Sequence, residues 1–297
     1  MKRSIALNAL LLLLCTALVG CGGKREDPIL RLSAAEALEQ GKEYLAQEKY
    51  FRAGQYLIHA FEVEPNSRSG REALLLAGDA LFLNGGTDNY IRCEAKYRDF
   101  LNRFPTSDQA DYAQFRVAEC LARRVEKPDR DQKVTVKALE AFEELLRLYP
   151  TSDYIPQTRQ RIREVRNLLA AHDLAVGHFH LRYGRGGQLC HGAIARLETV
   201  RDDYPDFSYM DVALFYLGVA YQQCRRAEDA QATWDDLQRQ FPDSKFVREV
   251  SDGQTPDRVG ALEKMELVED TKKKRKKKKK RQAKQDQNDG TEALGGA

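Results

Sequence analysis

The most regular alternation of apolar and polar positions runs from Leu214 to Ser244. Its apolar and small residues recur at spacings of one, three and four, which place them on one face of a helix. Two such sets follow one another: Leu214, Leu217, Gly218 and Tyr221, and then Ala230, Trp234 and Leu237. Pro242 follows the second set and ends it, because proline lacks an amide donor and clashes with the preceding turn. The stretch therefore predicts two closely packed helices joined by a short polar turn.

The pattern of the second helix recurs along the chain. A small residue is followed by a large residue four positions later, an apolar residue three positions after that, and a proline five positions further on. The five copies are Ala53, Leu57, Ala60 and Pro65; Cys93, Tyr97, Phe100 and Pro105; Ala138, Phe142, Leu145 and Pro150; Ala193, Leu197, Val200 and Pro205; and Ala230, Trp234, Leu237 and Pro242. A helix–turn–helix unit of about 34 residues with this pattern is typical of the tetratricopeptide repeat.

We therefore predict an all-α fold, a tetratricopeptide-like α-solenoid of about five helix–turn–helix repeats. An irregular helical bundle is the alternative, but it would not need proline at one fixed position. The five prolines are 40, 45, 55 and 37 residues apart, so the middle repeats carry insertions, including Arg123–Lys133 and the turn Gly184–Gly187. A serine follows most of the prolines closely, and serine is a good N-cap for the next helix.

The chain begins with a charged Met1-Lys2-Arg3 and an apolar run from Leu7 to Val19, which is too short for a comfortable membrane span and typical of a secretion signal. Small residues before Cys21 resemble the lipobox of bacterial lipoproteins, in which the cysteine carries lipid. We expect a signal peptide at residues 1–20, a lipidated tether at 21–32, repeats at 33–250 and a disordered tail at 251–297. A cleaved signal with a chance cysteine is the alternative.

The tail contains ten consecutive basic residues, from Lys272 to Arg281. The net charge of the whole chain is +3, so subtracting +10 leaves −7 for the remainder. Like-charge runs repel themselves and stay disordered. Outside the cytoplasm we expect no nucleic-acid partner, so lipid headgroups, lipopolysaccharide phosphates or acidic proteins are the candidate ligands. A solvated tail without a specific partner is the alternative.

Four cysteines remain in the repeats after Cys15 and Cys21 are set aside. The repeat arrangement packs each second helix antiparallel to the next first helix, which places Cys93 beside Cys120 and Cys190 beside Cys224. The cell envelope is oxidising, so we predict disulfides Cys93–Cys120 and Cys190–Cys224. Free buried cysteine is the alternative.

The sequence holds no recognisable catalytic motif and predicts no enzyme and no cofactor other than lipid on Cys21. It lacks a glycine-rich phosphate loop, HExxH, CxxC and the Gly-x-Ser-x-Gly elbow. His172, His178, His180 and His191 lie close together in the sequence, but His178 and His180 fall on different faces of a helix. We therefore predict no metal site, and keep a metal-dependent activity at these histidines as an alternative.

The repeats and the lipobox together resemble the BamD family, helical-repeat lipoproteins of the outer membrane β-barrel assembly machinery. The segment that carries the resemblance runs from Asp129 to Asp206. It contains Asp129–Gln132; Ala138, Phe142, Tyr149-Pro150, Ser152 and Tyr154; Leu169-Ala170 and His172-Asp173; Ala193–Arg196; and Asp203–Asp206. The resemblance covers about residues 15–245.

The resemblance implies a non-catalytic scaffold on the periplasmic face of the outer membrane. Its partners would be a BamA-like insertase, other lipoproteins of the machinery and unfolded outer membrane proteins. Arg196 matches an arginine in the insertase-binding region of the family, and Asp173 matches an acid, so both are expected to bind the partner. Bracing of the repeat, or projection into solvent, is the alternative for Arg196. The long turn at Gly184–Gly187 departs from the compact family pattern.

Two tyrosines of the first repeat, Tyr44 and Tyr50, are candidates for contact with an unfolded substrate, with core packing as the favoured alternative. A different tetratricopeptide lipoprotein of the envelope, such as a secretin pilotin or a peptidoglycan-linked division coordinator, would share the repeats and the lipobox. It would not share the pattern from Asp129 to Asp206.

Overall fold

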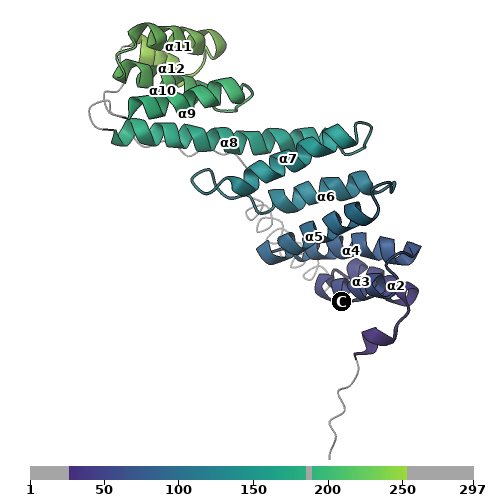
Figure 1. Ribbon diagram of the computed structural model, residues 1–297. Helices are drawn as coiled ribbons and strands as arrows, with labels where there is room; N and C mark the ends of the chain where they lie inside the picture. The colour runs from purple at the N-terminus through teal and green to yellow at the C-terminus, as the bar shows by residue number, and fades with distance from the viewer. Residues whose placement is uncertain (1–26, 185–188, 253–297) are drawn as a thin grey trace, which may run out of the picture. The chain divides into compact units, whose positions relative to one another are not determined.

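The computed structural model describes residues 27–184 and 189–252, and these residues form helices and turns without a β-strand (Figure 1). The elements are η1 (Pro28–Arg31), α2 (Ala34–Ala46), α3 (Tyr50–Val63), α4 (Arg68–Asn84), α5 (Thr87–Arg103), α6 (Ala110–Ala122), α7 (Lys133–Leu148), α8 (Ile155–Tyr183), α9 (Cys190–Asp203), α10 (Met210–Gln223), α11 (Ala227–Gln240) and α12 (Lys245–Ser251). The predicted all-α solenoid of helix–turn–helix repeats is confirmed. None of the described helices is both long and apolar enough to cross a membrane.

The chain divides into two compact units, one ending at Ala80 and the other starting at Leu81, so α4 begins in the first and ends in the second. In the first unit, α2 and α3 pack against each other as a helical hairpin. Gly41 permits this packing, because a Cβ atom there would lie 2.6 Å from Leu57 Cγ. The imidazole Nε2 of His59 lies 3.1 Å from the carbonyl oxygen of Leu32 and ties α3 to the turn before α2.

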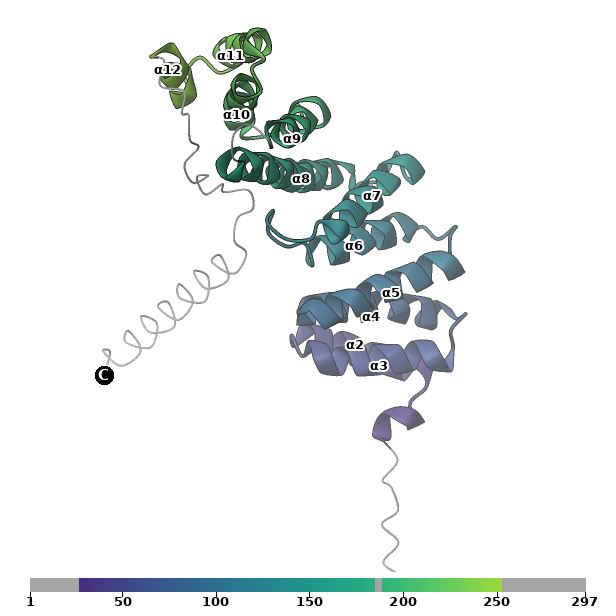
Figure 2. The same cartoon turned by 60° about the vertical axis from the view of Figure 1, so that its left-hand side comes forward.

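In the second unit, each helix from α5 to α11 packs on the next one along the chain (Figures 1 and 2). The small residue of each second-helix pattern, such as Cys93, Ala138 and Ala193, is completely buried or nearly so. Gly218 repeats the role of Gly41, because a Cβ atom there would lie only 2.0 Å from Trp234 Nε1. The predicted close approach at Gly218 is therefore present.

The longest spacing between repeat prolines, from Pro150 to Pro205, contains the long helix α8 and not only a longer loop. α8 has 29 residues, whereas the other α-helices before α12 have 13 to 17. Pro156 stands in the first turn of α8, where its missing N–H costs nothing. The first half of α8 lies beside α7 and the second half beside α9 (Figure 1).

The predicted serine caps are present at two of the repeat ends. Ser67 accepts a hydrogen bond from the Gly70 amide just before α4, and Ser244 accepts one from the Phe246 amide at the start of α12. Ser107 and Ser152 instead accept from the amide two residues later, and α6 and α8 begin three residues after them. At those two ends the serine closes a turn before the helix, so the cap prediction is wrong there.

Candidate partner-binding site

The site is built on the close crossing of α8 and α9. At Gly177 a Cβ atom would lie 2.8 Å from Leu197 Cγ and 3.4 Å from the Ala193 carbonyl oxygen, so a side chain there would push the helices apart. Leu197 is completely buried. This crossing fixes the register between α8 and α9. Gly177 is one helical turn from Asp173, and Ala193 is about one turn from Arg196.

Arg196 and Asp173, the two residues expected to bind a partner, form an ion pair. Arg196 Nη1 donates a 2.9 Å hydrogen bond to Asp173 Oδ1. The Asp173 side chain is 10% exposed and that of Arg196 is 50% exposed. The mostly buried Asp173 therefore orients the guanidinium of Arg196 from its protein-facing side. The guanidinium, which has five N–H donors, remains accessible to a carboxylate on a second molecule.

The turn after α9 lies against the same stretch of α8. Arg166 donates to the carbonyl oxygen of Asp203, and its guanidinium lies 5.3 Å from the centre of the Tyr204 ring. Burial, followed by the negative charges of Asp173 and Asp203, raises the pKa of the Tyr204 phenol. The hydroxyl therefore stays neutral at ordinary pH, and the local charge comes from the arginines and the two aspartates.

The insertion between α6 and α7 also contacts α8. His172 Nδ1 lies 2.6 Å from the carbonyl oxygen of Pro128, which fastens the loop to the helix next to Asp173. Within the loop, Gln132 donates to the carbonyl oxygens of Lys127 and Arg130. The insertion is thus an ordered loop beside the candidate site.

The histidines of this region do not form one cluster. His172 contacts Pro128, the buried His178 packs edge-on against Tyr216, and the ring of His180 lies against Gly192 on α9. His191 is exposed, and its Nδ1 lies 3.8 Å from Cys190 Sγ. The four imidazoles therefore point to different neighbours.

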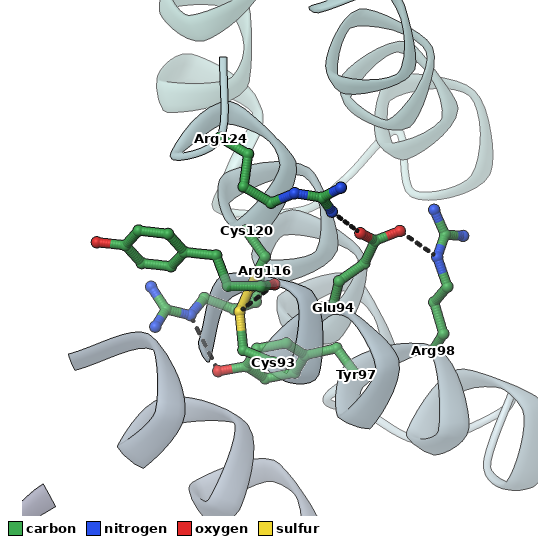
Figure 3. Close-up of a disulfide and its surroundings, with 8 residues drawn as sticks. Cys93, Glu94, Tyr97, Arg98, Arg116, Cys120 and Arg124 are labelled. Atoms are coloured by element: carbon green, nitrogen blue, oxygen red, sulfur yellow. Dashed lines mark hydrogen bonds and ion pairs between the residues drawn. A yellow bond between two sulfur atoms is a disulfide. The ribbon is translucent and has the colours of Figure 1, made fainter. Parts of the chain in front are cut away.

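The cysteines are paired as the repeat arrangement predicts. Cys93 of α5 is bonded to Cys120 of α6, and Cys190 of α9 to Cys224 at the end of α10. Figure 3 shows the first pair beneath an ion-pair bridge in which Glu94 accepts from Arg98 at 3.0 Å and from Arg124 at 2.7 Å. Because Cys93 and Cys120 are completely buried, this link lies in the core between α5 and α6.

One ion pair with a buried carboxylate was not predicted from the sequence. Arg161 of α8 donates to both carboxylate oxygens of Glu119 of α6, at 2.7 and 3.1 Å, and Glu119 is nearly buried. The available signal was an acidic residue between apolar neighbours on the inner face of a helix, since buried charges in proteins are normally paired. The pair ties α6 to α8 across α7.

The remaining sequence candidates lie elsewhere. Cys21 is outside the described residues. Tyr44 is half-buried, with its ring 5.1 Å from that of Tyr56 and with Lys49 near its face, and Tyr50 is half-buried at the start of α3. Both tyrosines belong to the first unit.

The chain matches the model of the YfiO family, described as outer membrane lipoprotein, over residues 31–237. The chain belongs to this family. It is 26% identical to the outer membrane protein assembly factor BamD of Caulobacter vibrioides over 237 residues, which are 79% of this chain and 75% of that protein. It is 24% identical to BamD of Rickettsia prowazekii over 246 residues, 83% of this chain and 95% of that protein.

Among solved structures, a tetratricopeptide protein of Thermus thermophilus matches 75% of this chain and 98% of its own chain, at 15% identity and a TM-score of 0.32. The family predicted from the segment Asp129 to Asp206 is confirmed by the family model and the relatives. Membership also supports the expectation of a scaffold rather than an enzyme.

Proposed function

We propose that this protein is a lipid-anchored scaffold of outer membrane protein assembly that binds a BamA-like insertase through its fourth and fifth repeats. The observation that carries the proposal is the arginine at the crossing of α8 and α9. Arg196 is half-exposed and is held by the mostly buried Asp173. Family membership and the assembly-factor relatives support the general role.

The ion pair suits a contact with an acidic partner surface. Asp173 removes part of the freedom of the arginine side chain before binding, which lowers the entropy cost of ordering it in an interface. The planar guanidinium can offer two parallel donors to a carboxylate, which a lysine ammonium cannot do. We expect the partner to present a glutamate or aspartate to this position.

Lipid on Cys21 would hold the chain at the periplasmic face of the outer membrane, because several buried acyl chains anchor a protein firmly. The first unit, with Tyr44 and Tyr50, is then the part nearest the anchor in the sequence and is assigned to unfolded barrel substrates. Other lipoproteins of the assembly machinery are expected as additional partners. No nucleic acid is expected in this compartment.

The test is a mild-detergent pull-down from envelopes with tagged, lipidated protein. We expect a large barrel protein with repeated periplasmic domains as the main co-purifying species. Arg196→Glu should abolish its recovery, Arg196→Lys should reduce it, and Asp173→Asn should reduce it several-fold. Arg147→Glu is the matched control, because Arg147 on α7 is 70% exposed and pairs only locally with Glu144 in the described contacts.

Two results would count against the proposal in different ways. If Arg196→Glu recovers as much insertase as the wild type, the contact is assigned to the wrong residue. If a secretin or a peptidoglycan-binding lipoprotein is recovered instead, the assembly role itself is wrong.

A further inference from the structure

The two disulfides differ in their surroundings. Both sulfurs of Cys93–Cys120 are completely buried in the core. In the second pair Cys190 is buried, but Cys224 is half-buried and the adjacent His191 is exposed. A small-molecule or protein dithiol can therefore approach the second pair, whereas the first is closed within its helix hairpin.

The second pair also has a third donor beside it. The ligand atoms of Cys190, His191 and Cys224 all lie within 4.8 Å of one another, the one group of this kind among the described residues. We propose that these three residues form a zinc site when the Cys190–Cys224 disulfide is reduced. This inference is independent of the proposed function and departs from the sequence expectation of no metal site.

The geometry already fits part of a zinc centre. Tetrahedral zinc with Zn–S near 2.3 Å and Zn–N near 2.0–2.1 Å has an S···N edge of about 3.6 Å and an S···S edge of about 3.8 Å. Cys190 Sγ and His191 Nδ1 are 3.8 Å apart. The two bonded sulfurs must separate, and Cys224 Sγ and the His191 nitrogen, which lie within 4.8 Å of each other, must adjust as well. The Cα atoms of the two cysteines are 5.6 Å apart, so side-chain rotation can provide that movement without shifting the helices.

A dithiol is the reductant that would open the Cys190–Cys224 disulfide. The dithiol is oxidised to its cyclic disulfide and gives two electrons and two protons to the Cys190–Cys224 bond, which becomes two thiols. Zn²⁺ then binds as two thiolates, and two protons are released. The donors favour zinc over magnesium or calcium, because thiolates are soft ligands and imidazole also suits zinc, whereas magnesium and calcium prefer oxygen. Cys190 is the first residue of α9, where free amide groups favour a thiolate.

His191 is exposed and Cys224 is half-buried, so one side of the three-donor cluster is open to solvent. The site therefore resembles three-ligand zinc centres that keep a water in the fourth position. Its location has a structural consequence, since it joins α9 to α10 and hence the fourth repeat to the fifth. Reduction would replace a covalent link by one that depends on a metal ion.

The experiment uses the purified, lipidated full chain in detergent. The protein is treated with dithiothreitol, freed of reductant without oxygen, and mixed with ZnCl₂ or, as a spectroscopic probe, CoCl₂. We expect the oxidised protein to retain no stoichiometric zinc and the reduced protein to retain one ion per chain. Bound cobalt should give a thiolate-to-metal charge-transfer absorption.

Three variants make the result specific. Cys190→Ser with Cys224→Ser should lose the ion, and Cys93→Ser with Cys120→Ser should keep it. His191→Ala changes an exposed side chain and should fold normally. It should weaken zinc binding by at least about tenfold, since loss of an outer-shell partner alone costs that much at other sites.

Several outcomes would overturn the proposal. One is a reduced protein that binds no ion, and another is an unchanged zinc affinity in His191→Ala. A third is a loss of helical circular dichroism on reduction that zinc does not restore, because the three donors would then no longer be held together.

Discussion

Ser152 donates a 2.6 Å hydrogen bond from its hydroxyl to Asp111 Oδ2 and thereby joins the two ends of one repeat. Asp111 is the second residue of α6, and Ser152 stands in the turn after α7. The same relationship recurs at the end of the array, where Ser244 donates to Asp211 at 2.7 Å and Asp211 is the second residue of α10. The serine after the repeat proline therefore has a structural role at both positions, and at Ser244 this role is in addition to capping.

This contact predicts a measurable coupling between Ser152 and Asp111. Hydrogen bonds to charged groups contribute about 1.5–3 kcal/mol, and partial exposure should reduce this value to about 1 kcal/mol. We expect Ser152→Ala and Asp111→Asn to lower the free energy of unfolding in urea less in combination than the sum of their separate effects. Ser107→Ala is the control, since its hydroxyl donates to the neighbouring Asp108 instead. Strict additivity of the first two changes would show that the bond contributes nothing.

Gly218 gives a second prediction, about packing. A Cβ atom at this position would lie 2.0 Å from Trp234 Nε1, which donates to the Phe215 carbonyl oxygen at 3.3 Å. Gly218→Ala must displace the indole, so we expect a loss of about 1–3 kcal/mol in unfolding free energy.

Gly54 in α3 is the matched control for this substitution, because the nearest atom to a Cβ there is Ala80 Cβ at 3.9 Å. Gly54→Ala should stabilise the protein by about 0.5–1 kcal/mol through helix propensity. Thermal unfolding followed by circular dichroism compares the two. Equal effects of the two substitutions would contradict the packing argument.

The fold could be predicted from the sequence because its signals are local and repeated. The helix crossings depend on glycine and on large residues at fixed spacing, as at Gly218 and Trp234, and helix periodicity relates those spacings to shared faces. The cysteine pairs followed from the same arrangement. The length of α8 could not be predicted in the same way. The sequence between Pro156 and Gly177 contains no proline or glycine that would mark the end of a helix.

The candidate site could be predicted only in part. Arg196 and Asp173 were each named, but their mutual ion pair depends on the register between α8 and α9, which the crossing at Gly177 sets. Glu119 and Arg161 are 42 positions apart, so the position of Glu119 among apolar residues indicates a buried acid but does not identify its partner. The contact of His172 with Pro128 depends likewise on the path of an insertion, which periodicity does not describe.

Glu36 gives a pH prediction. Its carboxylate accepts hydrogen bonds from the hydroxyl and amide of Ser33, which lower the pKa of Glu36 below its ordinary value of 4.5. A carboxyl with a lower pKa in the folded state stabilises that state above its unfolded pKa, and this contribution is lost as pH falls through the folded pKa. We expect the difference in melting temperature between wild type and Glu36→Gln to shrink between pH 6 and pH 3.

The capping partner provides the control for this pH effect. In a Ser33→Ala background the hydroxyl hydrogen bond, the larger cause of the lowered pKa of Glu36, is absent and only the backbone amide bond remains. Adding Glu36→Gln should therefore change the melting temperature by an amount that varies less with pH than in the wild-type background. A difference between wild type and Glu36→Gln that stays constant with pH would contradict the assignment of the lowered pKa to the capping contact.

The disulfides give the last prediction, a count of thiols. In the mature protein Cys21 would be blocked by lipid, and the other four cysteines are paired between α5 and α6 and between α9 and α10. Titration with a thiol reagent in denaturant should therefore find no free thiol before reduction and four after it. The two links close loops of 27 and 34 residues, and loops of this size restrict the unfolded chain by about 3–4 kcal/mol each. Replacing both cysteines of either pair by serine should lower the urea midpoint, whereas four free thiols in unreduced protein would show that neither bond forms.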